Sequence, residues 1–170
     1  MLLRRAQAQN LPAIVALLAD DQLGTTRDGA TDVEGLAPYL RAFSAIDSDP
    51  AQLLVVATVD ANVDADVVGT LQLSFLPGLA RRGALRGQIE AVRVHGSYRG
   101  RGLGAAMITW AIDEGRRRGC ALMQLTTDKS LVDAHRFYLR LGFVASHEGL
   151  KRATTPVIAG SGSTASWSPP

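Results

Sequence analysis

The chain has 170 residues and a mass of 18.0 kDa, which suits one domain and leaves little room for a second. Hydrophobic residues make up 46% of it and charged residues 20%, a balance too apolar for an intrinsically disordered protein. Eighteen Lys and Arg against sixteen Asp and Glu give a net charge of +2. The single cysteine, Cys120, excludes an intrachain disulfide and a cysteine-rich metal site, and it suits a reducing compartment.

The net charge is divided unevenly along the chain. Residues 1–66 hold four Arg and ten acidic residues, a net −6, whereas residues 67–170 hold fourteen basic and six acidic residues, a net +8. The second part therefore suits an anionic partner, although solvated faces of mixed charge explain the same pattern. The N-terminus lacks the apolar run of a signal peptide, and no apolar stretch approaches the roughly 20 residues that span a bilayer. We expect a cytoplasmic protein without a membrane segment.

The N-terminal part of the sequence predicts one strand, two helices and a hairpin. Asn10 and Pro12 are typical of a helix start, and Pro38 interrupts the second helical pattern. After residue 52 the apolar period changes to two, which indicates strands. The predicted elements are a strand (2–6), a helix (10–21), a polar loop (24–31), a helix (32–46), and two antiparallel strands (52–59 and 66–75) joined by a turn (60–65).

The C-terminal part predicts alternating strands and helices. Ser130 and Asp133 have the spacing of a capping box, and Gly142 ends the helix that they open. The predicted elements are a basic loop (77–87), a strand (88–95), a helix (102–118), a strand (120–127), a helix (130–142) and a last strand (143–146), which a further strand (151–154) would extend. We therefore expect one α/β or α+β domain over residues 1–154 with a mixed sheet, followed by a flexible Gly/Ser/Pro-rich tail over residues 155–170.

A glycine-rich loop stands between the predicted strand 88–95 and the helix that follows it. Gly100, Gly102 and Gly104 lack side chains that would keep a bulky ligand from the backbone, and a helix N-terminus presents unpaired N–H groups. Arg99 and Arg101 add charge-assisted hydrogen bonds to an anion. The helix dipole contributes about 0.3 to 1 kcal/mol for a negative charge at that end. The loop therefore predicts a site for a pyrophosphate.

Two nucleotide-binding patterns compete for this loop. A P-loop requires Gly-Lys-Ser/Thr, but Ala105 follows Gly104, so this pattern fails. Gly100, Gly102 and Ala105 fit the dinucleotide pattern G-x-G-x-x-A, with Asp128 as a ribose acceptor. That pattern expects glycines directly after the strand, whereas several residues intervene here. A nicotinamide-dinucleotide site stays open as the weaker alternative.

The segment Arg99-x-x-Gly102-x-Gly104 resembles the R/Q-x-x-G-x-G/A signature of the GNAT family of N-acetyltransferases. The surrounding sequence agrees, because Ile-Glu-Ala-Val-Arg-Val precedes the signature over residues 89–94, and Ala-His-Arg-Phe-Tyr (134–138) and Leu-Gly-Phe (141–143) follow it. The resemblance is specific over residues 88–146. It implies a mixed central sheet with helices on both faces, and an acyl-CoA-dependent N-acetyltransferase that uses acetyl-CoA and no metal.

The resemblance also implies a cofactor site. Val92 and Val94 would offer backbone groups to pantetheine and the acetyl carbonyl. The pyrophosphate would bind the loop made of Arg99, Gly100, Arg101, Gly102, Leu103 and Gly104. In the family the strand before the loop splays from the strand predicted at 120–127, and the thioester lies in the gap. The asparagine that often contacts pantetheine is replaced by Leu131, so Ser130 or Asp128 would have to substitute.

Acyl transfer to an amine requires a proton for the leaving thiolate and a base for the amine. Tyr138 matches the family's general acid, and its reference pKa near 10 keeps the phenol protonated at neutral pH. Glu90 matches a glutamate that many relatives use as a base, often through water. The alternatives are a core tyrosine and a solvent-facing glutamate. We expect His95 and His135 to be structural or surface residues and Cys120 to be a core residue.

The acceptor is predicted from charge alone. Acidic residues around the first two helices cover the region where the family recognises its acceptor, so we expect a cationic amine. The basic residues Arg81, Arg82 and Arg86 are expected near or within the pyrophosphate cradle. Aromatic residues make up only 5% of the chain, which argues against nucleic-acid binding. A silent CoA-binding regulatory module is the alternative function, and a homodimer is a common assembly in the family.

Overall fold

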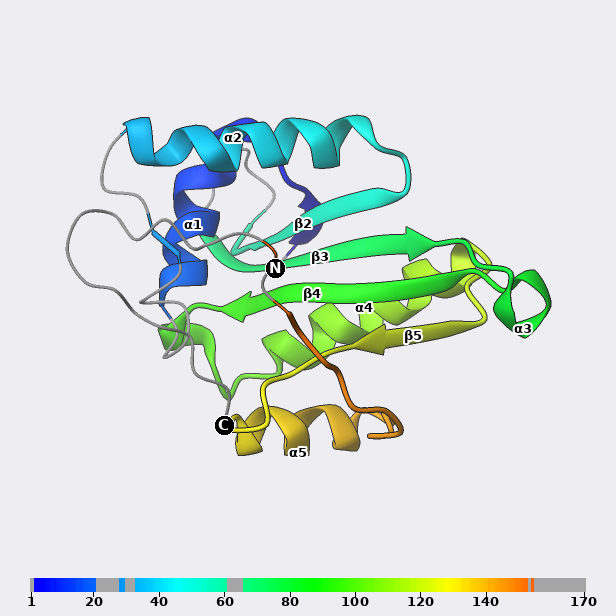
Figure 1. The fold of residues 1–170 in the computed structure, drawn as a ribbon. Coiled ribbons are helices and arrows are strands. Elements are labelled where there is room, and N and C mark those ends of the chain that lie inside the picture. The colour runs from blue at the N-terminus through cyan, green and yellow to red at the C-terminus, as the bar shows by residue number, and fades with distance from the viewer. Residues whose placement is uncertain (1, 21–27, 30–32, 61–65, 153, 155–170) are drawn as a thin grey trace.

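The computed structural model describes residues 2–20, 28–29, 33–60, 66–152 and 154 (Figure 1). Five strands and the helices between them alternate along the chain. The strands are β1 (Leu2–Arg5), β2 (Gln52–Thr58), β3 (Val67–Leu76), β4 (Arg86–Val94) and β5 (Leu122–Leu125). The helices are α1 (Leu11–Ala19), α2 (Val33–Ser48), the short turn α3 (Ala80–Gly83), α4 (Leu103–Arg117) and α5 (Val132–Arg140), with 3₁₀ turns η1 (Ala8–Asn10) and η2 (Gly96–Tyr98).

The strands form one mixed sheet in the order β1-β2-β3-β4-β5. Neighbours pair antiparallel from β1 to β4, whereas β5 pairs parallel to β4 across helix α4, as a crossover connection requires. The mixed sheet predicted from the element order is therefore confirmed.

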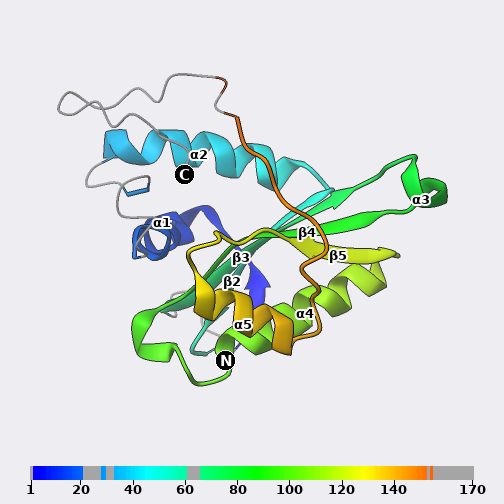
Figure 2. The same ribbon diagram turned by 60° about the horizontal axis from the view of Figure 1, so that its bottom comes forward.

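Helices cover both faces of the sheet (Figure 2). Helix α4 packs on one face through Leu103, Met107, Ile108 and Ala111, which are buried against strand residues such as Val55 and Leu73. On the other face, α1 and α2 pack through residues such as Ile14 and Phe43 against Leu54 and Val56. Consecutive residues of β2 enter the two cores alternately, as the period of a strand requires. The helices predicted on the two faces are thus present.

Most elements lie close to their predicted positions, namely β1, α1, α2, β2, β3 and α4. The predicted helix caps, however, are not the ones that form. The Asn10 side chain accepts hydrogen bonds from Gln7 N and Arg4 Nη1, both at 3.0 Å, so it holds the preceding 3₁₀ turn and does not cap α1. The predicted capping box is also absent, since the Ser130 hydroxyl donates to Asp128 Oδ1 at 2.7 Å. The Ser130 hydroxyl is thus used by a local turn with Asp128 and does not cap helix α5.

The strand predicted at 143–146 is wrong. Phe143 N donates to Tyr138 O at 3.1 Å and Ser146 N donates to Val144 O at 2.9 Å. The first bond satisfies a carbonyl at the end of α5, so the chain turns back locally and does not extend along the sheet. Cys120 precedes β5 instead of starting it, and it is partly buried against the core.

Several predicted segments fall outside the described residues. These are most of the loop 24–31, most of the turn 60–65 and the tail 155–170. The strand proposed for 151–154 is not formed at Lys151 and Arg152. No helix among the described residues is long and apolar enough to cross a bilayer.

Candidate active site

The centre of the site is an irregularity in strand β4. Thr70 pairs with Arg93 and Gln72 pairs with Glu90, so Leu71 of β3 faces two residues of β4, Ala91 and Val92. This is a β-bulge, and Ala91 takes the left-handed conformation there, with φ of +52°. An alanine in that conformation costs about 1 kcal/mol, which the pairing on both sides of the bulge must offset.

Strands β4 and β5 separate directly before the bulge. Their pairing runs from Arg86↔Leu122 to Ile89↔Leu125 and goes no further among the described residues. His95 N donates to Val68 O at 2.9 Å, so His95 and, two residues back, Arg93 direct their backbone groups to β3. Because backbone direction alternates along a strand, Val92 and Val94 direct theirs to the side that β5 has left. This is the separation that the family resemblance implied.

After the 3₁₀ turn η2, the glycine-rich loop leads from this strand end into helix α4. Gly102 is the N-cap of α4 with φ of +81°, a conformation that strongly favours glycine. A Cβ on Gly104 would lie 3.4 Å from Phe137 Cζ and 3.8 Å from Val94 Cγ2. These are ordinary van der Waals distances, and they show that α4 lies beside both α5 and β4 at Gly104. The first-turn N–H groups of α4 come to lie beside the backbone that β5 has left.

The two arginines of the loop have different surroundings. Arg99 Nε donates to Val94 O at 3.0 Å, and Arg99 Nη2 contacts Asp20 Oδ2 at 3.1 Å at the end of α1. Arg101 lies 5.7 Å from the centroid of the Tyr98 ring. A hollow of about 350 Å³ opens beside them, lined by Val59, Val68, Tyr98, Arg101, Gly102, Leu103 and Ala106. The hollow thus combines apolar walls, a cation and a helix N-terminus.

Tyr138 lies on α5, whose apolar face packs on the core as the sequence predicts. Its ring is partly buried and contacts Phe137 and Phe143 edge to face, with centroids 5.1 and 5.9 Å apart. Burial raises the pKa of Tyr138 above its usual value of 10, although the charge of Arg93 opposes the shift. The phenol therefore remains protonated at neutral pH and can donate a proton.

Glu90 lies on the other side of β4. It is exposed and shares a face with Gln72 and Gln88, opposite the face that packs on α4. The structure thus places Glu90 beside the bulge on the face opposite α4, and Tyr138 on α5, where the charge of Arg93 acts on its phenol. No hydrogen bond joins them in the described part of the chain.

Sequence reasoning missed Arg93. It pairs with Thr70 on the Glu90 side of the sheet, donates from Nη1 to Val92 O at 2.9 Å, and acts electrostatically on Tyr138. The signal available in the sequence was a second charged residue, three positions after Glu90, in the strand that precedes the signature. The histidines are as predicted: His95 accepts from Ser97 N at the strand exit, and His135 contacts Asp128 O.

The expectation that Arg81, Arg82 and Arg86 lie in the cradle is wrong. They belong to the turn joining β3 to β4 or to the first residue of β4, and the cradle follows the last residue of β4. Nine strand residues, about 30 Å, separate the two ends. Charge counting along the sequence could not reveal this, because antiparallel pairing places consecutive loops at opposite ends of the sheet.

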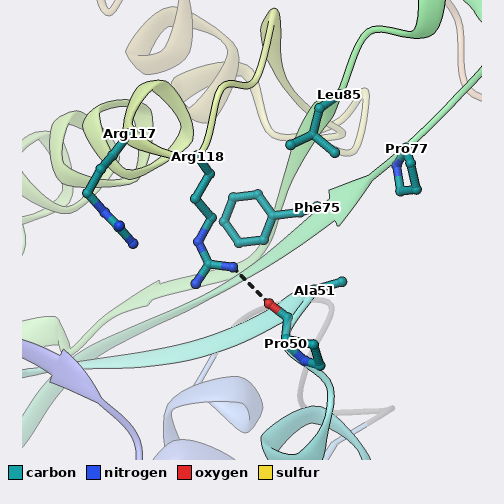
Figure 3. A pocket seen from close by; sticks show the side chains of 7 residues that line it. All are labelled: Pro50, Ala51, Phe75, Pro77, Leu85, Arg117 and Arg118. Atoms are coloured by element: carbon teal, nitrogen blue, oxygen red, sulfur yellow. Dashed lines mark hydrogen bonds between the residues drawn. The ribbon is translucent and has the colours of Figure 1, made fainter.

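A second hollow, of about 590 Å³, lies at the far end of α4 (Figure 3). Arg118 fills part of it, with its guanidinium carbon 4.1 Å from the centroid of the Phe75 ring and Nη1 donating to Pro50 O at 2.8 Å. These contacts join the end of α4 to β2 and β3, which indicates a structural role. No cluster of metal-ligating side chains occurs among the residues that the structure describes.

Known proteins share this fold. A sequence model of the acetyltransferase (GNAT) family matches residues 12–143. The crystal structure of a transcriptional regulator from Bacillus halodurans C-125 is 44% identical, with a TM-score of 0.82 over 89% of this chain and 98% of that chain.

Two curated relatives match about half of the chain. The aminoalkylphosphonate N-acetyltransferase of Salmonella typhimurium is 36% identical over 84 residues, 49% of this chain and 54% of the relative. The glucosamine 6-phosphate N-acetyltransferase of Trypanosoma brucei brucei is 42% identical over 83 residues, 48% of this chain and 53% of the relative. The chain thus spans about half the length of the curated relatives it matches. Because the family match runs from α1 to beyond α5, the chain belongs to the acetyltransferase (GNAT) family.

Proposed function

We propose that this protein is an N-acetyltransferase that moves the acetyl group of acetyl-CoA to a primary amine. One observation carries the proposal: β4 leaves β5 at a bulge directly beside a glycine-rich helix N-terminus. Backbone donors for a thioester arm and an anion site for a pyrophosphate are thereby adjacent. Membership in the GNAT family supports the same activity.

The chain's own groups suit acetyl-CoA as a substrate. The hollow beside Gly102 and Arg101 offers backbone N–H groups and a cation to the pyrophosphate. Val92 and Val94 offer backbone groups to the pantetheine arm. Arg99 Nη2 contacts Asp20 in an exposed ion pair that contributes about 1 kcal/mol or less, so its loss on pyrophosphate binding would cost little.

Acetyl-CoA supplies a thioester carbon that an amine can attack directly, so that a C–N bond forms and the C–S bond breaks. The amine nitrogen loses a proton and the departing sulfur gains one. Tyr138 donates the second proton, because its raised pKa keeps the phenol protonated. Glu90 receives the first through water, from the exposed face of β4. The proposed mechanism is thus a direct attack in a ternary complex.

The acceptor proposed from sequence is a cationic amine. The two curated relatives are named for acceptors that carry both an amine and a phosphorus-containing group. Arg93 lies on the same face of β4 as Glu90, the proposed base, and its charge supports an anionic group beside the amine. The acidic residue Asp20, at the end of α1, is already paired with Arg99 and so offers less to a cationic acceptor. An amine that also carries a phosphate is therefore the second acceptor class.

A regulatory protein that binds CoA without turnover is the alternative. The similar protein from Bacillus halodurans is described as a transcriptional regulator, which favours this alternative. The presence of both Tyr138 and Glu90 beside the bulge favours catalysis. A homodimer remains the proposed assembly.

Calorimetry and an amine panel test the proposal. We expect acetyl-CoA to bind with micromolar or tighter affinity and NADH not to bind. Release of free CoA thiol should then depend on the added amine, across amino acids, polyamines, amino sugars and amino phosphonates. Binding of NADH alone would reject the family-based assignment of the loop. Binding of acetyl-CoA without turnover of any amine would favour the regulatory module.

A further inference from the structure

A row of uncharged polar side chains crosses the sheet beside Glu90. We call it the amide strip: Gln52 of β2, Gln72 and Ser74 of β3, Gln88 of β4 and Gln124 of β5. Register places these residues side by side, because Gln52 pairs with Ser74, Ser74 with Gln88, and Gln88 with Gln124. Gln72 pairs with Glu90, so the strip continues directly from the proposed base.

The strip lies on the face of the sheet opposite α4. The intervening residues of the same strands, such as Leu53, Leu73 and Ile89, point to the α4 side and are buried. Helices α1 and α2 pack on this same face of the sheet, α1 against β3 and β4 and α2 against β2 (Figure 2). The four glutamines are only partly buried. If these positions only filled the core, apolar side chains would stabilise the fold better than amides, because burying an amide costs free energy.

Internal hydrogen bonds hold the strip in shape. Gln52 Oε1 accepts from Gln72 Nε2 at 3.1 Å and from Ser74 Oγ at 2.7 Å. Gln88 Oε1 accepts from Gln124 Nε2 at 2.7 Å. Each bond fixes one end of an amide and thereby orients the other end.

These bonds leave hydrogen-bonding groups for a ligand. Gln52 Nε2 and Gln88 Nε2 are donors, and Gln72 Oε1 and Gln124 Oε1 are acceptors, with no hydrogen bond to the described part of the chain. None of these groups is charged. Donors and acceptors side by side match hydroxyl groups, since each hydroxyl both donates and accepts.

We infer that the amide strip binds the body of the acceptor and that this body carries several hydroxyl groups, as in an amino sugar or an amino polyol. The inference rests on the proposed acetyltransferase function. With the amine beside Glu90, a hydroxylated body would reach Gln72 directly across the strand pair and Gln88 two residues along β4, about 7 Å away. The strip then determines acceptor specificity, while charge on the amine contributes less than expected from sequence.

Equilibrium binding in the presence of CoA tests this without requiring turnover. Glucosamine and cyclohexylamine, a ring amine without hydroxyls, are titrated into the CoA-saturated protein and its variants. We expect glucosamine to bind at least about 10-fold more tightly than cyclohexylamine. The variant Gln88→Leu should weaken glucosamine binding by about 3- to 10-fold, since a net hydrogen bond contributes about 0.5 to 1.5 kcal/mol. Gln9→Leu, an equivalent change at an exposed glutamine of η1, should match the wild type.

Acetyl-CoA affinity separates the outcomes. Gln124→Leu serves as the second variant if Gln88→Leu lowers acetyl-CoA binding or thermal stability. Equal affinity for the two amines, or unchanged glucosamine binding in both leucine variants, would overturn the inference and leave acetyl transfer to other amines standing. Failure of wild-type protein to bind acetyl-CoA would instead remove the proposed function.

Discussion

At the scale of single residues, the site depends on how burial sets proton affinity. Tyr138 has its pKa raised by burial, with the charge of Arg93 opposing the shift. Arg93 directly follows the bulge of β4, where this strand separates from β5. A phenol in this position keeps its proton at neutral pH and has it available for the departing thiolate.

The variant Tyr138→Phe should lower kcat by about 10²- to 10⁴-fold, because positioned acid catalysis contributes that much. Acetyl-CoA affinity should stay within about twofold. An acid works only while it is protonated, and the pKa of Tyr138 is raised, so wild-type kcat should fall with rising pH only above about 10. That fall should vanish in the variant. Steady-state kinetics across pH measure both effects, with Tyr39→Phe on α2 as control; an unchanged kcat would refute the acid role.

At the scale of elements, the N-terminus of α4 must carry the anion site. Ala106 is exposed in the first turn, lines the hollow, and donates its N–H to Gly102 O at 3.0 Å. A carboxylate there suits the positive end of the helix dipole and so does not destabilise the helix. The same carboxylate repels a pyrophosphate.

Ala106→Glu should therefore weaken acetyl-CoA binding by about 10-fold or more, which corresponds to about 1.4 kcal/mol of repulsion. Thermal stability should be equal to or slightly above that of the wild type. Thr109→Glu, with the same charge one turn further along the exposed side of α4, should bind acetyl-CoA nearly as the wild type does. Calorimetry and thermal unfolding measure the two quantities; equal affinities in both variants would argue against an anion at this helix end.

At the scale of the whole molecule, Arg118 connects segments far apart in the sequence. Its guanidinium contacts the Phe75 ring and Pro50 O (Figure 3). It also pairs with Glu114 Oε1 at 2.8 Å. Hydrogen bonds from Arg117 and Arg118 lower the pKa of Glu114 against the opposing effect of burial. A lowered pKa stabilises the fold above the unfolded value of about 4.5, and the contribution is lost as pH falls through the folded value.

Arg118→Leu should lower the free energy of unfolding at pH 7 by about 1 to 3 kcal/mol, since Pro50 O and part of Glu114 lose their partner. The difference from wild type should shrink in acid, where Glu114 becomes protonated. Urea unfolding at pH 7, and again below the folded pKa of Glu114, measures the free energy of unfolding of the variant and of the wild type. Arg116→Leu, which removes an exposed pair with Asp113, should change stability by less than about 0.5 kcal/mol. Equal losses in both variants would contradict the proposed connection.

Much of this protein follows from local sequence. Strand and helix periods predict nearly every element, because the alternation of buried residues repeats within each element. The glycine-rich signature and its neighbours led to the family, which the match over residues 12–143 confirms. Local hydrogen bonds caused the errors at Asn10, Ser130 and residues 143–146, where a turn or a helix end competes with the predicted pattern.

Contacts between distant segments required the tertiary structure. The sequence does not show the bulge at Ala91, because a bulge exists only where two residues of one strand face a single residue of the paired strand. The amide strip appears only when register aligns glutamines from residues 52 to 124. The sequence shows that the acidic and basic residues are unevenly divided along the chain, but it does not show where they lie in the fold. Arg81, Arg82 and Arg86 lie far from the proposed pyrophosphate site, and Arg99 contacts Asp20 of the acidic part. The sequence by itself determines the charge distribution and the apolar periodicity of each element. Strand pairing in the tertiary structure determines which charged and amide side chains become neighbours.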